Sequence, residues 1–577
     1  MLALSYRLFF LLVALPALLC AEEPAEILEK VRAHMQLRNF ASAALSAEQG
    51  LINYPESKEL RLALIEALSQ KGDEIAAVSR ALDPGGSFTE SERNQMVEWL
   101  AWGAIGKAGL SNQLPIRMST LVSAATTRDA RALPLLSVHL TDSNSHLRSL
   151  AVRLVPLLGD KTLCNRLITM LDQEKVWYVR LELIRAIGQL RLREGEPKLR
   201  EILSHKNTLA EERFAAVIAL VSIYQSVSES EIVHLIASNR AGLRQLAAEL
   251  ILHFEMRSAG KQLIQLLSDS AADVRISALN ALALLGAPEG AKDQIEQLLK
   301  DSNPAVAITA AWCSLVTQNV KGEEFLARHL HCGNQEWARF AAGSIAHSGS
   351  AGTALAQREI MRTSDPYVRM NLALALIYQR KNLPLAKEML WGSYNGESSA
   401  LWMWDSSKNP LFRVLEQSRV SHIDQIPSYP EAISGLTRLE ILSILGALDF
   451  SDAQKGMKEL LKNRSWYVAG GAAEALLQDG DQESRALALA LLNDVDPKVR
   501  LQAALVLGFA GGEPGLATAV LIEGYQVADR ETKMQIVRAL GSLGDKQSIP
   551  FLLEVVSEPG STLRTMAAGA IIECLYK

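Results

Sequence analysis

The sequence predicts an all-α protein of the α-solenoid class, and three observations carry this prediction. An arginine followed by small and aliphatic residues recurs along the 577 residues, with most neighbouring copies 30 to 33 residues apart. Aromatic residues make up only 6% of the chain, which suits closely packed helices better than sheets. Asp496 and Pro497 precede an apolar run of helical spacing, as a capping residue and a first-turn proline do. A fixed period of this size is typical of stacked helical hairpins.

The first element expected along the chain is an export signal over residues 1–21. Arg7 precedes an apolar run over 8–19, and Ala21 is followed by the charged residue Glu22. This run is shorter than the roughly 20 apolar residues that span a bilayer. We therefore expect cleavage between Ala21 and Glu22, a mature chain without an integral membrane span, and a location in a bacterial periplasm or cell envelope.

The cysteines leave a second possibility for the N-terminus. Cys20 suggests a lipoprotein, but Leu19 stands where the lipidation motif requires a small residue, so lipid anchoring is the less favoured alternative. The other cysteines are scattered and have no CxxC spacing, which favours buried apolar roles over disulfides. They are Cys164, Cys313, Cys332 and Cys574.

Residues 22–85 show a helical pattern that differs from the rest. Small residues such as Ala43 and Gly50 stand where two helices would cross, and Pro55 ends the second helix. This arrangement resembles a short tetratricopeptide repeat, which implies a peptide-binding module. An irregular hairpin that caps the solenoid is the alternative interpretation.

Residues 86–130 are expected to form connecting helices. Trp99 and Trp102 lie three residues apart and so share a helix face, which favours a core position. The stretch 103–108 has the glycines and lysine of a phosphate-binding loop, but Ala101 and Ala108 replace its first glycine and its metal-binding hydroxyl.

The regular array is expected over residues 131–391 and 432–577. One unit over 269–299 has a turn, a helix, a break at Gly286 and a second helix, and the stretch 538–553 repeats this plan. These units resemble the HEAT repeat, in the bacterial form called the phycobilin-lyase-type HEAT-like repeat. Some copies depart from the pattern, because Ala307 and Ala469 replace the arginine and Lys533 substitutes for it.

The recurring arginine is predicted to be structural. It follows the turn closely enough to donate hydrogen bonds to the carbonyls or the aspartate of an adjacent turn, which would link the repeats into a ladder. A phosphate-binding stripe would look similar in sequence. The residues assigned to the ladder are Arg148, Arg180, Arg275, Arg369 and Arg500.

Residues 392–431 interrupt the array with an irregular, aromatic-rich segment. Insertions in solenoids tend to lie on one face and often bind the partner. Trp402, Trp404 and Tyr429 are therefore predicted to contact a partner protein. The alternative is that these aromatic residues fill the gap left by a missing helix pair.

The sequence contains few candidate catalytic or metal-binding motifs. His329, His331 and Cys332 form the densest group of possible metal ligands, but residues two apart converge only where a helix ends. His139 and His146 lie in a turn region and are expected to face solvent. No catalytic residues and no cofactor are predicted.

These observations predict an exported, non-enzymatic scaffold or assembly adaptor that binds another protein or peptide. The net charge of −5 disfavours nucleic acid as the main ligand. The alternatives are a lyase-type enzyme, which the resemblance to HEAT-like bilin lyases implies, and, less favoured, a nucleic-acid binder. The sequence does not fix the oligomeric state.

Overall fold

The computed structural model describes residues 23–83, 87–205, 207–395, 482–509, 514–558 and 560–577, with parts of 441–456. Every regular element among these residues is a helix, and no strand occurs there. The predicted all-α solenoid is therefore confirmed. The chain forms two compact units: Met1–Arg128 with Tyr525–Lys577, and Asp129–Gly524.

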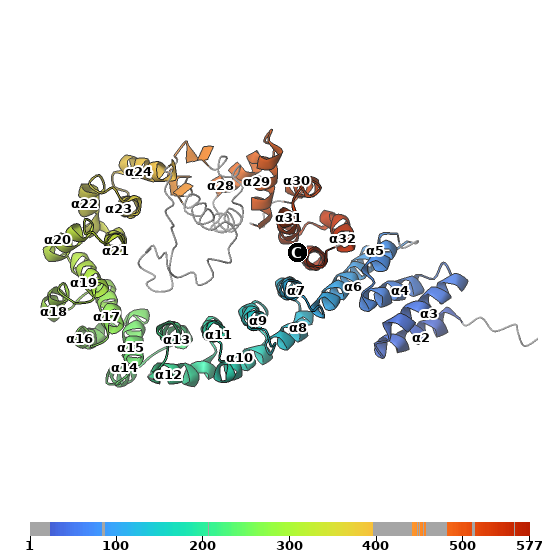
Figure 1. Cartoon of the computed structure of the whole chain (residues 1–577), viewed down its shortest axis with the longest axis horizontal. Helices are drawn as coiled ribbons and strands as arrows, with labels where there is room; N and C mark the ends of the chain where they lie inside the picture. The colour runs from blue at the N-terminus through green and yellow to red at the C-terminus, as the bar shows by residue number, and fades with distance from the viewer. Residues whose placement is uncertain are drawn as a thin grey trace, which may run out of the picture. The chain divides into compact units, whose positions relative to one another are not determined.

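The first unit combines helices from the two ends of the chain (Figure 1). Its helices are α2 (Pro24–Gln36), α3 (Phe40–Asn53), α4 (Lys58–Lys71), α5 (Glu74–Leu82), α6 (Glu90–Gly109), α7 (Leu114–Thr126), α31 (Arg530–Leu543), α32 (Ile549–Ser557) and α33 (Ser561–Tyr576). Helix α3 packs against both α2 and α4, and α33 packs against α6, α7, α31 and α32. The sequence analysis placed residues 525–577 with the second array; periodicity reports only on neighbouring repeats and could not reveal this grouping.

Local sequence explains where these helices begin and end. The Thr89 hydroxyl accepts a hydrogen bond from the Glu92 N–H at 3.3 Å, and the Glu92 carboxylate accepts one from the Thr89 N–H at 2.8 Å. This reciprocal capping box starts α6. Helix α4 ends at Gly72, whose φ of 76° is the left-handed conformation that glycine adopts without strain.

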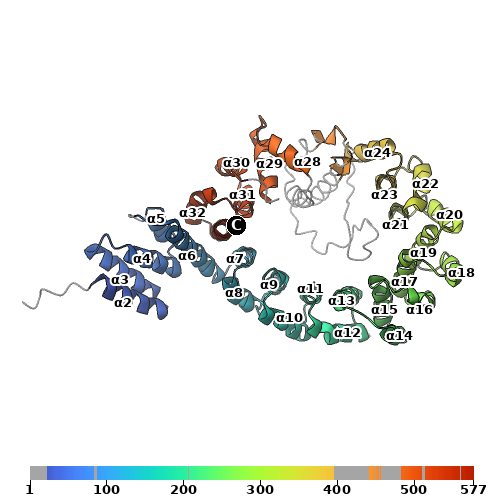
Figure 2. The same ribbon diagram turned by 180° about the vertical axis from the view of Figure 1, so that it is seen from behind.

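The second unit is an array of helical hairpins in two rows, as Figure 1 and, from behind, Figure 2 show. The inner row comprises α9 (Ser145–Leu158), α11 (Trp177–Gln189), α13 (Ala210–Ile223), α15 (Ala241–His253), α17 (Ala272–Leu285), α19 (Pro304–Val316), α21 (Gln335–Ala346) and α23 (Pro366–Tyr378). The outer row comprises α8 (Leu133–His139), α10 (Lys161–Gln173), α12 (Glu196–Ser204), α14 (Glu229–Ile236), α16 (Gly260–Leu266), α18 (Lys292–Leu298), α20 (Val320–His329), α22 (Ser350–Glu359) and α24 (Leu383–Asn395). Further along lie α28 (Gln482–Leu491), α29 (Pro497–Phe509) and α30 (Leu516–Tyr525).

Short 3-10 helices lead into several of the outer-row helices. Those described in the chain are Ala130–Ala132, Arg193–Gly195, Arg257–Ala259, Glu289–Ala291 and, before α32, Lys546–Ser548.

The inner row forms the continuous core of this unit. Each inner helix packs directly against the next, whereas outer helices touch their own neighbours much less. Small residues allow this close approach: a Cβ on Gly188 of α11 would lie 2.6 Å from the Cα of Ala219 on α13. Trp312 of α19 is the largest fully buried side chain among the described residues and is 1% exposed. Removal of this apolar surface from water holds successive repeats together.

One predicted boundary needs correction. The regular array was expected to stop at residue 391, but α24 continues through Asn395. Its last turn is fixed by Tyr394, which is buried and donates a hydrogen bond from its hydroxyl to the carbonyl of Gly456 at 2.7 Å. The ring of Trp391 stacks on Tyr394 with centroids 5.0 Å apart. Aromatic packing therefore extends the helix beyond the point where the repeat pattern fails.

Candidate functional site

The recurring arginines bind the turn of the following repeat. Arg148 donates from Nε and Nη2 to the two carboxylate oxygens of Glu174, at 2.7 and 2.9 Å. Glu174 also accepts hydrogen bonds from the N–H groups of Lys175 and Val176 at 3.0 and 2.9 Å. One carboxylate thus fixes the start of α11 and ties it to α9, so this pair joins two repeats.

The same arrangement recurs along the array. The arginine–carboxylate pairs are Arg180–Glu212 at 2.7 Å, Arg244–Asp269 at 2.5 Å, Arg275–Asp301 at 2.9 Å and Arg339–Asp365 at 3.2 Å. We call these pairs, with Arg148–Glu174, the turn ladder. Arg244 and Arg339 belong to it although the sequence analysis did not assign them to the ladder.

Each arginine also holds its own turn. Arg148, Arg275 and Arg500 donate from Nη1, and Arg369 from Nε, to a carbonyl six residues upstream. The distances are 2.8, 2.7, 3.1 and 2.7 Å. Arg500 has only a loose carboxylate neighbour, Glu523 at 3.9 Å. A guanidinium occupied in this way has few donors left for a phosphate.

Two repeats depart from this arrangement, and one of them supports a pairing role. Arg213 is followed by the turn 237–240, which has no carboxylate, and the buried Nε of Arg213 has no hydrogen-bond partner among the described residues. Ala307 replaces the arginine of its repeat, and the next turn, 330–334, again has no carboxylate. At Ala307 the arginine and the acidic residue are therefore absent together, whereas Arg213 is an arginine whose next turn lacks a carboxylate.

The turn ladder makes stability depend on pH. Burial raises the pKa of Glu174 and of Asp269, but hydrogen bonds from Arg148 and Arg244 and from backbone N–H groups outweigh it, so both pKa values are lowered. A carboxyl with a lowered folded-state pKa contributes stability above its unfolded pKa, about 4, and loses it as the pH falls through the folded value.

We therefore expect the urea midpoint to fall between about pH 5 and pH 3. The double variant Glu174→Gln with Asp269→Asn should start from a lower midpoint at neutral pH and lose less of it on acidification. Urea titrations at the two pH values measure this. Equal losses in the variant and the parent would contradict a role for these carboxylates.

The predicted metal candidates do not converge. Helix α20 does end at His329, but His329 stacks on Phe325 with centroids 3.9 Å apart. His331 contacts Glu359 at 3.0 Å, and the thiol of Cys332 donates to the Asn334 carbonyl at 3.3 Å. Among the described residues, no group of three or more histidine, cysteine, aspartate or glutamate side chains is placed to hold a metal.

His139 was expected to face solvent, and this prediction is wrong. It is the last residue of α8 and is 2% exposed, with Nδ1 2.8 Å from the carbonyl oxygen of Leu135. Because His139 lies on the apolar face of this short helix, its side chain is buried together with that face. His146 is exposed and stacks on Tyr178 with centroids 5.6 Å apart.

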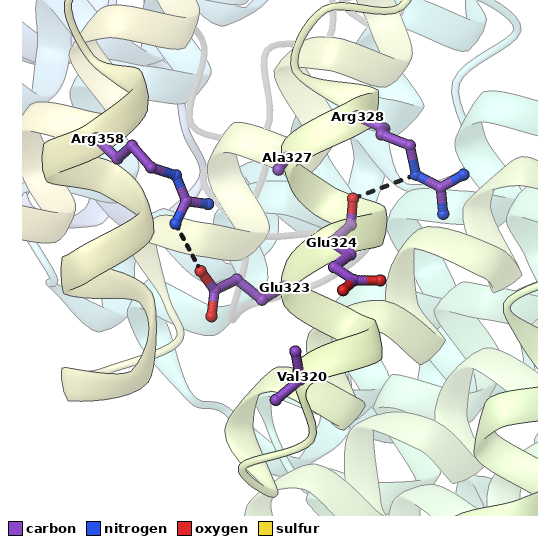
Figure 3. A pocket seen from close by; sticks show the side chains of 6 residues that line it. All are labelled: Val320, Glu323, Glu324, Ala327, Arg328 and Arg358. Atoms are coloured by element: carbon purple, nitrogen blue, oxygen red, sulfur yellow. Dashed lines mark hydrogen bonds and ion pairs between the residues drawn. The ribbon is translucent and has the colours of Figure 1, made fainter.

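A groove between α20 and α22 is the candidate binding site on the outer row. Its volume is about 490 Å³, and it is lined by Val320, Glu323, Glu324, Ala327, Arg328 and Arg358. Figure 3 shows Arg358 reaching from α22 to the carboxylate of Glu323 on α20, at 2.9 Å. The groove is open to solvent and carries both charges, so it suits a polar, extended ligand better than an enclosed small molecule.

A buried carboxylate anchors one wall of this groove. Glu359 is 4% exposed and contacts Arg358 at 2.9 Å, His331 at 3.0 Å and Arg362 at 3.4 Å. Burial raises the pKa of Glu359, but His331, Arg358 and Arg362 lower it by more than burial raises it. The net pKa is therefore below the usual range. The ionised carboxylate holds Arg358 in place beside the groove.

This groove was not predicted from the sequence, although one signal for it is present. Glu323 and Arg358 lie 35 residues apart, which is close to one repeat. Opposite charges one period apart on outer helices would have indicated the bridge. The predicted partner contacts Trp402, Trp404 and Tyr429 lie outside the described residues and remain predictions. Ala469, which replaces the arginine in one repeat, lies outside them too.

The comparisons with known proteins concern the repeat. A family model of HEAT repeats matches residues 259–316, 454–524 and 484–572. No curated protein sequence matches the chain. No helix among the residues described is long and apolar enough to cross a bilayer.

Several solved structures are distantly similar. The complex of CpcE and CpcF of phycocyanin lyase from Nostoc sp. PCC7120 is 18% identical, and the match covers 44% of this chain and 94% of that one, with a TM-score of 0.28. The UNC-45 chaperone of muscle myosin is 11% identical, with 96% and 82% covered and a TM-score of 0.37. Kap95p, solved with RanGDP, is 13% identical, with 96% and 86% covered and a TM-score of 0.31. Likeness this distant says nothing about reaction or partner.

Proposed function

Because this chain is a HEAT-repeat protein, we propose that it acts as an exported, non-enzymatic scaffold or assembly adaptor that binds another protein or peptide. The groove between α20 and α22 supports this most directly. It is open to solvent, and its charged groups Glu323 and Arg358 pair with each other. Glu323 and Glu324 offset the two guanidinium groups that line the groove, so it lacks the concentrated positive charge that a phosphate backbone needs and fits a polypeptide better than a nucleic acid.

Capture of a partner tests the proposal. Val320 lines the groove and is 66% exposed, so Val320→Glu should leave stability nearly unchanged while placing a charge in the binding surface. With the mature chain as bait in an envelope extract, we expect mass spectrometry to identify a protein whose recovery falls about tenfold, equivalent to ~1.4 kcal/mol. The double variant Trp402→Ala with Trp404→Ala, from the predicted contact segment, is a second bait.

Val527→Glu is the matched control, since Val527 is 88% exposed and lies outside the groove. It should recover the same protein as the unmodified chain. If no protein is enriched by the unmodified bait, or if Val320→Glu and Val527→Glu recover it equally, the groove is not the binding site. A large fall in melting temperature of the double tryptophan variant would favour the gap-filling alternative.

Export is tested separately at the N-terminus. In an exporting bacterial host we expect the mature protein to begin at Glu22, after cleavage of residues 1–21. N-terminal sequencing of the protein from the periplasmic fraction measures this. A chain that keeps residues 1–21 would contradict the export signal, and a lipid-modified Cys20 would support the lipoprotein alternative.

A further inference from the structure

Helix α33 is buried over most of its circumference in its second half. The buried hydrophobic residues there are Ala567, Ala568, Ala570, Ile571, Ile572 and Cys574. A helix that buries apolar side chains this widely must be enclosed by other elements. Its own hairpin partner α32 and the preceding helix α31 cover part of it, and α6 and α7, from the other end of the chain, cover the rest.

The contact between α33 and α7 has the geometry of two neighbouring repeats. A Cβ on Gly569 of α33 would lie 2.9 Å from the Cβ of Ser123 on α7. On the other side, a Cβ on Gly541 of α31 would lie 2.8 Å from the Cα of Ala570. Both approaches match the one between Gly188 and its neighbouring inner helix. Helix α33 therefore lies between α31 and α7 as an inner helix lies between its neighbours in the array.

Polar side chains surround this apolar contact. Arg564 lies 3.9 Å from the carboxylate of Glu74, which also accepts a hydrogen bond from Lys107 at 2.8 Å. The Tyr576 hydroxyl donates to Glu98. Lys546 lies 4.0 Å from Glu90, and both side chains are largely exposed. A buried apolar centre with a charged rim is the usual anatomy of a specific protein interface.

We propose that the apolar face of α6 and α7 is the docking surface for the chain's own C-terminal hairpin, α32 and α33. Helices α6 and α7 then serve as the cap of the last repeat. A solenoid exposes apolar surface at its end unless a cap covers it. The entropy lost in joining distant segments grows only with the logarithm of the intervening length, so a long array between them is tolerated. This inference is independent of the proposed function.

A zero-length crosslink tests the docking in the full chain. A carbodiimide joins a lysine amine to a carboxylate in direct contact, and Lys546 with Glu90 is an exposed pair that spans the docking surface. We expect this crosslink in the monomer fraction of the unmodified protein. In Gly569→Leu, which inserts a side chain between α33 and α7, its yield should fall at least fivefold.

Gly106→Leu is the control, because a Cβ on Gly106 of α6 meets nothing within 4 Å; its crosslink yield should stay unchanged. Hydrogen exchange of α9 to α23 in each variant shows that the array itself remains folded. Absence of the crosslink in the unmodified protein would overturn the proposal. In a mixture of isotope-labelled and unlabelled protein, a crosslink between two copies would equally overturn it, since the hairpin would then dock on a second chain.

Discussion

Replacing Asp269 by alanine is expected to lower the free energy of unfolding by about 3 kcal/mol, as loss of one partner from a buried ion pair does. The carboxylate accepts hydrogen bonds from Arg244 at 2.5 and 2.7 Å and from the N–H of Ala271 at 2.8 Å. The two paired side chains are only 15% and 6% exposed. The alanine variant therefore leaves a largely buried guanidinium without its counter-charge and removes the acceptor for the N–H of Ala271, the residue before α17.

The exposed Asp273, within the same turn of chain, is the matched control. Asp273→Ala should cost no more than about 0.5 kcal/mol, the size of a helix-dipole contribution. Urea denaturation gives the difference, and hydrogen exchange should place the loss at α15 and α17. The double variant Arg244→Met with Asp269→Leu should recover most of the stability, because no unpaired charge remains. Equal losses for Asp269→Ala and Asp273→Ala would show that the pair adds nothing.

Recurrence in the sequence predicted Arg148, Arg180 and Arg275 as donors of the turn ladder, although not Arg244 and Arg339, and it could not predict the acceptors. Every arginine stands at the same place after its turn, so the recurrence reveals it. The carboxylate that accepts from the arginine stands at different positions. In some repeats it precedes the next inner helix, as Glu174 and Asp269 do, and in another it lies inside that helix, as Glu212 does. A carboxylate can reach the same guanidinium from several backbone positions, so no fixed spacing marks it.

A repeat pattern also cannot predict contacts between distant segments of the chain, for a different reason. Periodicity shows that each unit packs on the next one, but the last unit has no successor in the sequence. Nothing in the spacing of Gly569 or Ser123 indicates that they meet, since each reads as an ordinary small residue on a helix. The docking of α33 on α7 becomes visible only when backbone geometry is known.

Glycines that resemble a nucleotide-binding motif have a packing explanation in this fold. Gly103 lies inside α6, where a phosphate-binding loop would need irregular backbone before a helix. A Cβ at this position would lie 2.1 Å from the carbonyl oxygen of Ser69 and 2.7 Å from its carbon, both on α4. Backbone atoms cannot rotate away as a flexible side chain can. The glycine is therefore required by the crossing of α4 and α6.

The variants Gly103→Ala and Gly106→Ala should consequently shift stability in opposite directions. Both residues lie in α6, and in an isolated helix either change would stabilise by up to about 1 kcal/mol. At Gly106, where a Cβ meets nothing within 4 Å, we expect this gain. At Gly103 the added methyl group must push α4 from α6, and overpacking of this kind costs about 2 to 3 kcal/mol. Thermal and urea unfolding of the two variants measure the difference. A gain at both positions would mean that α4 and α6 do not approach as closely as the glycine allows.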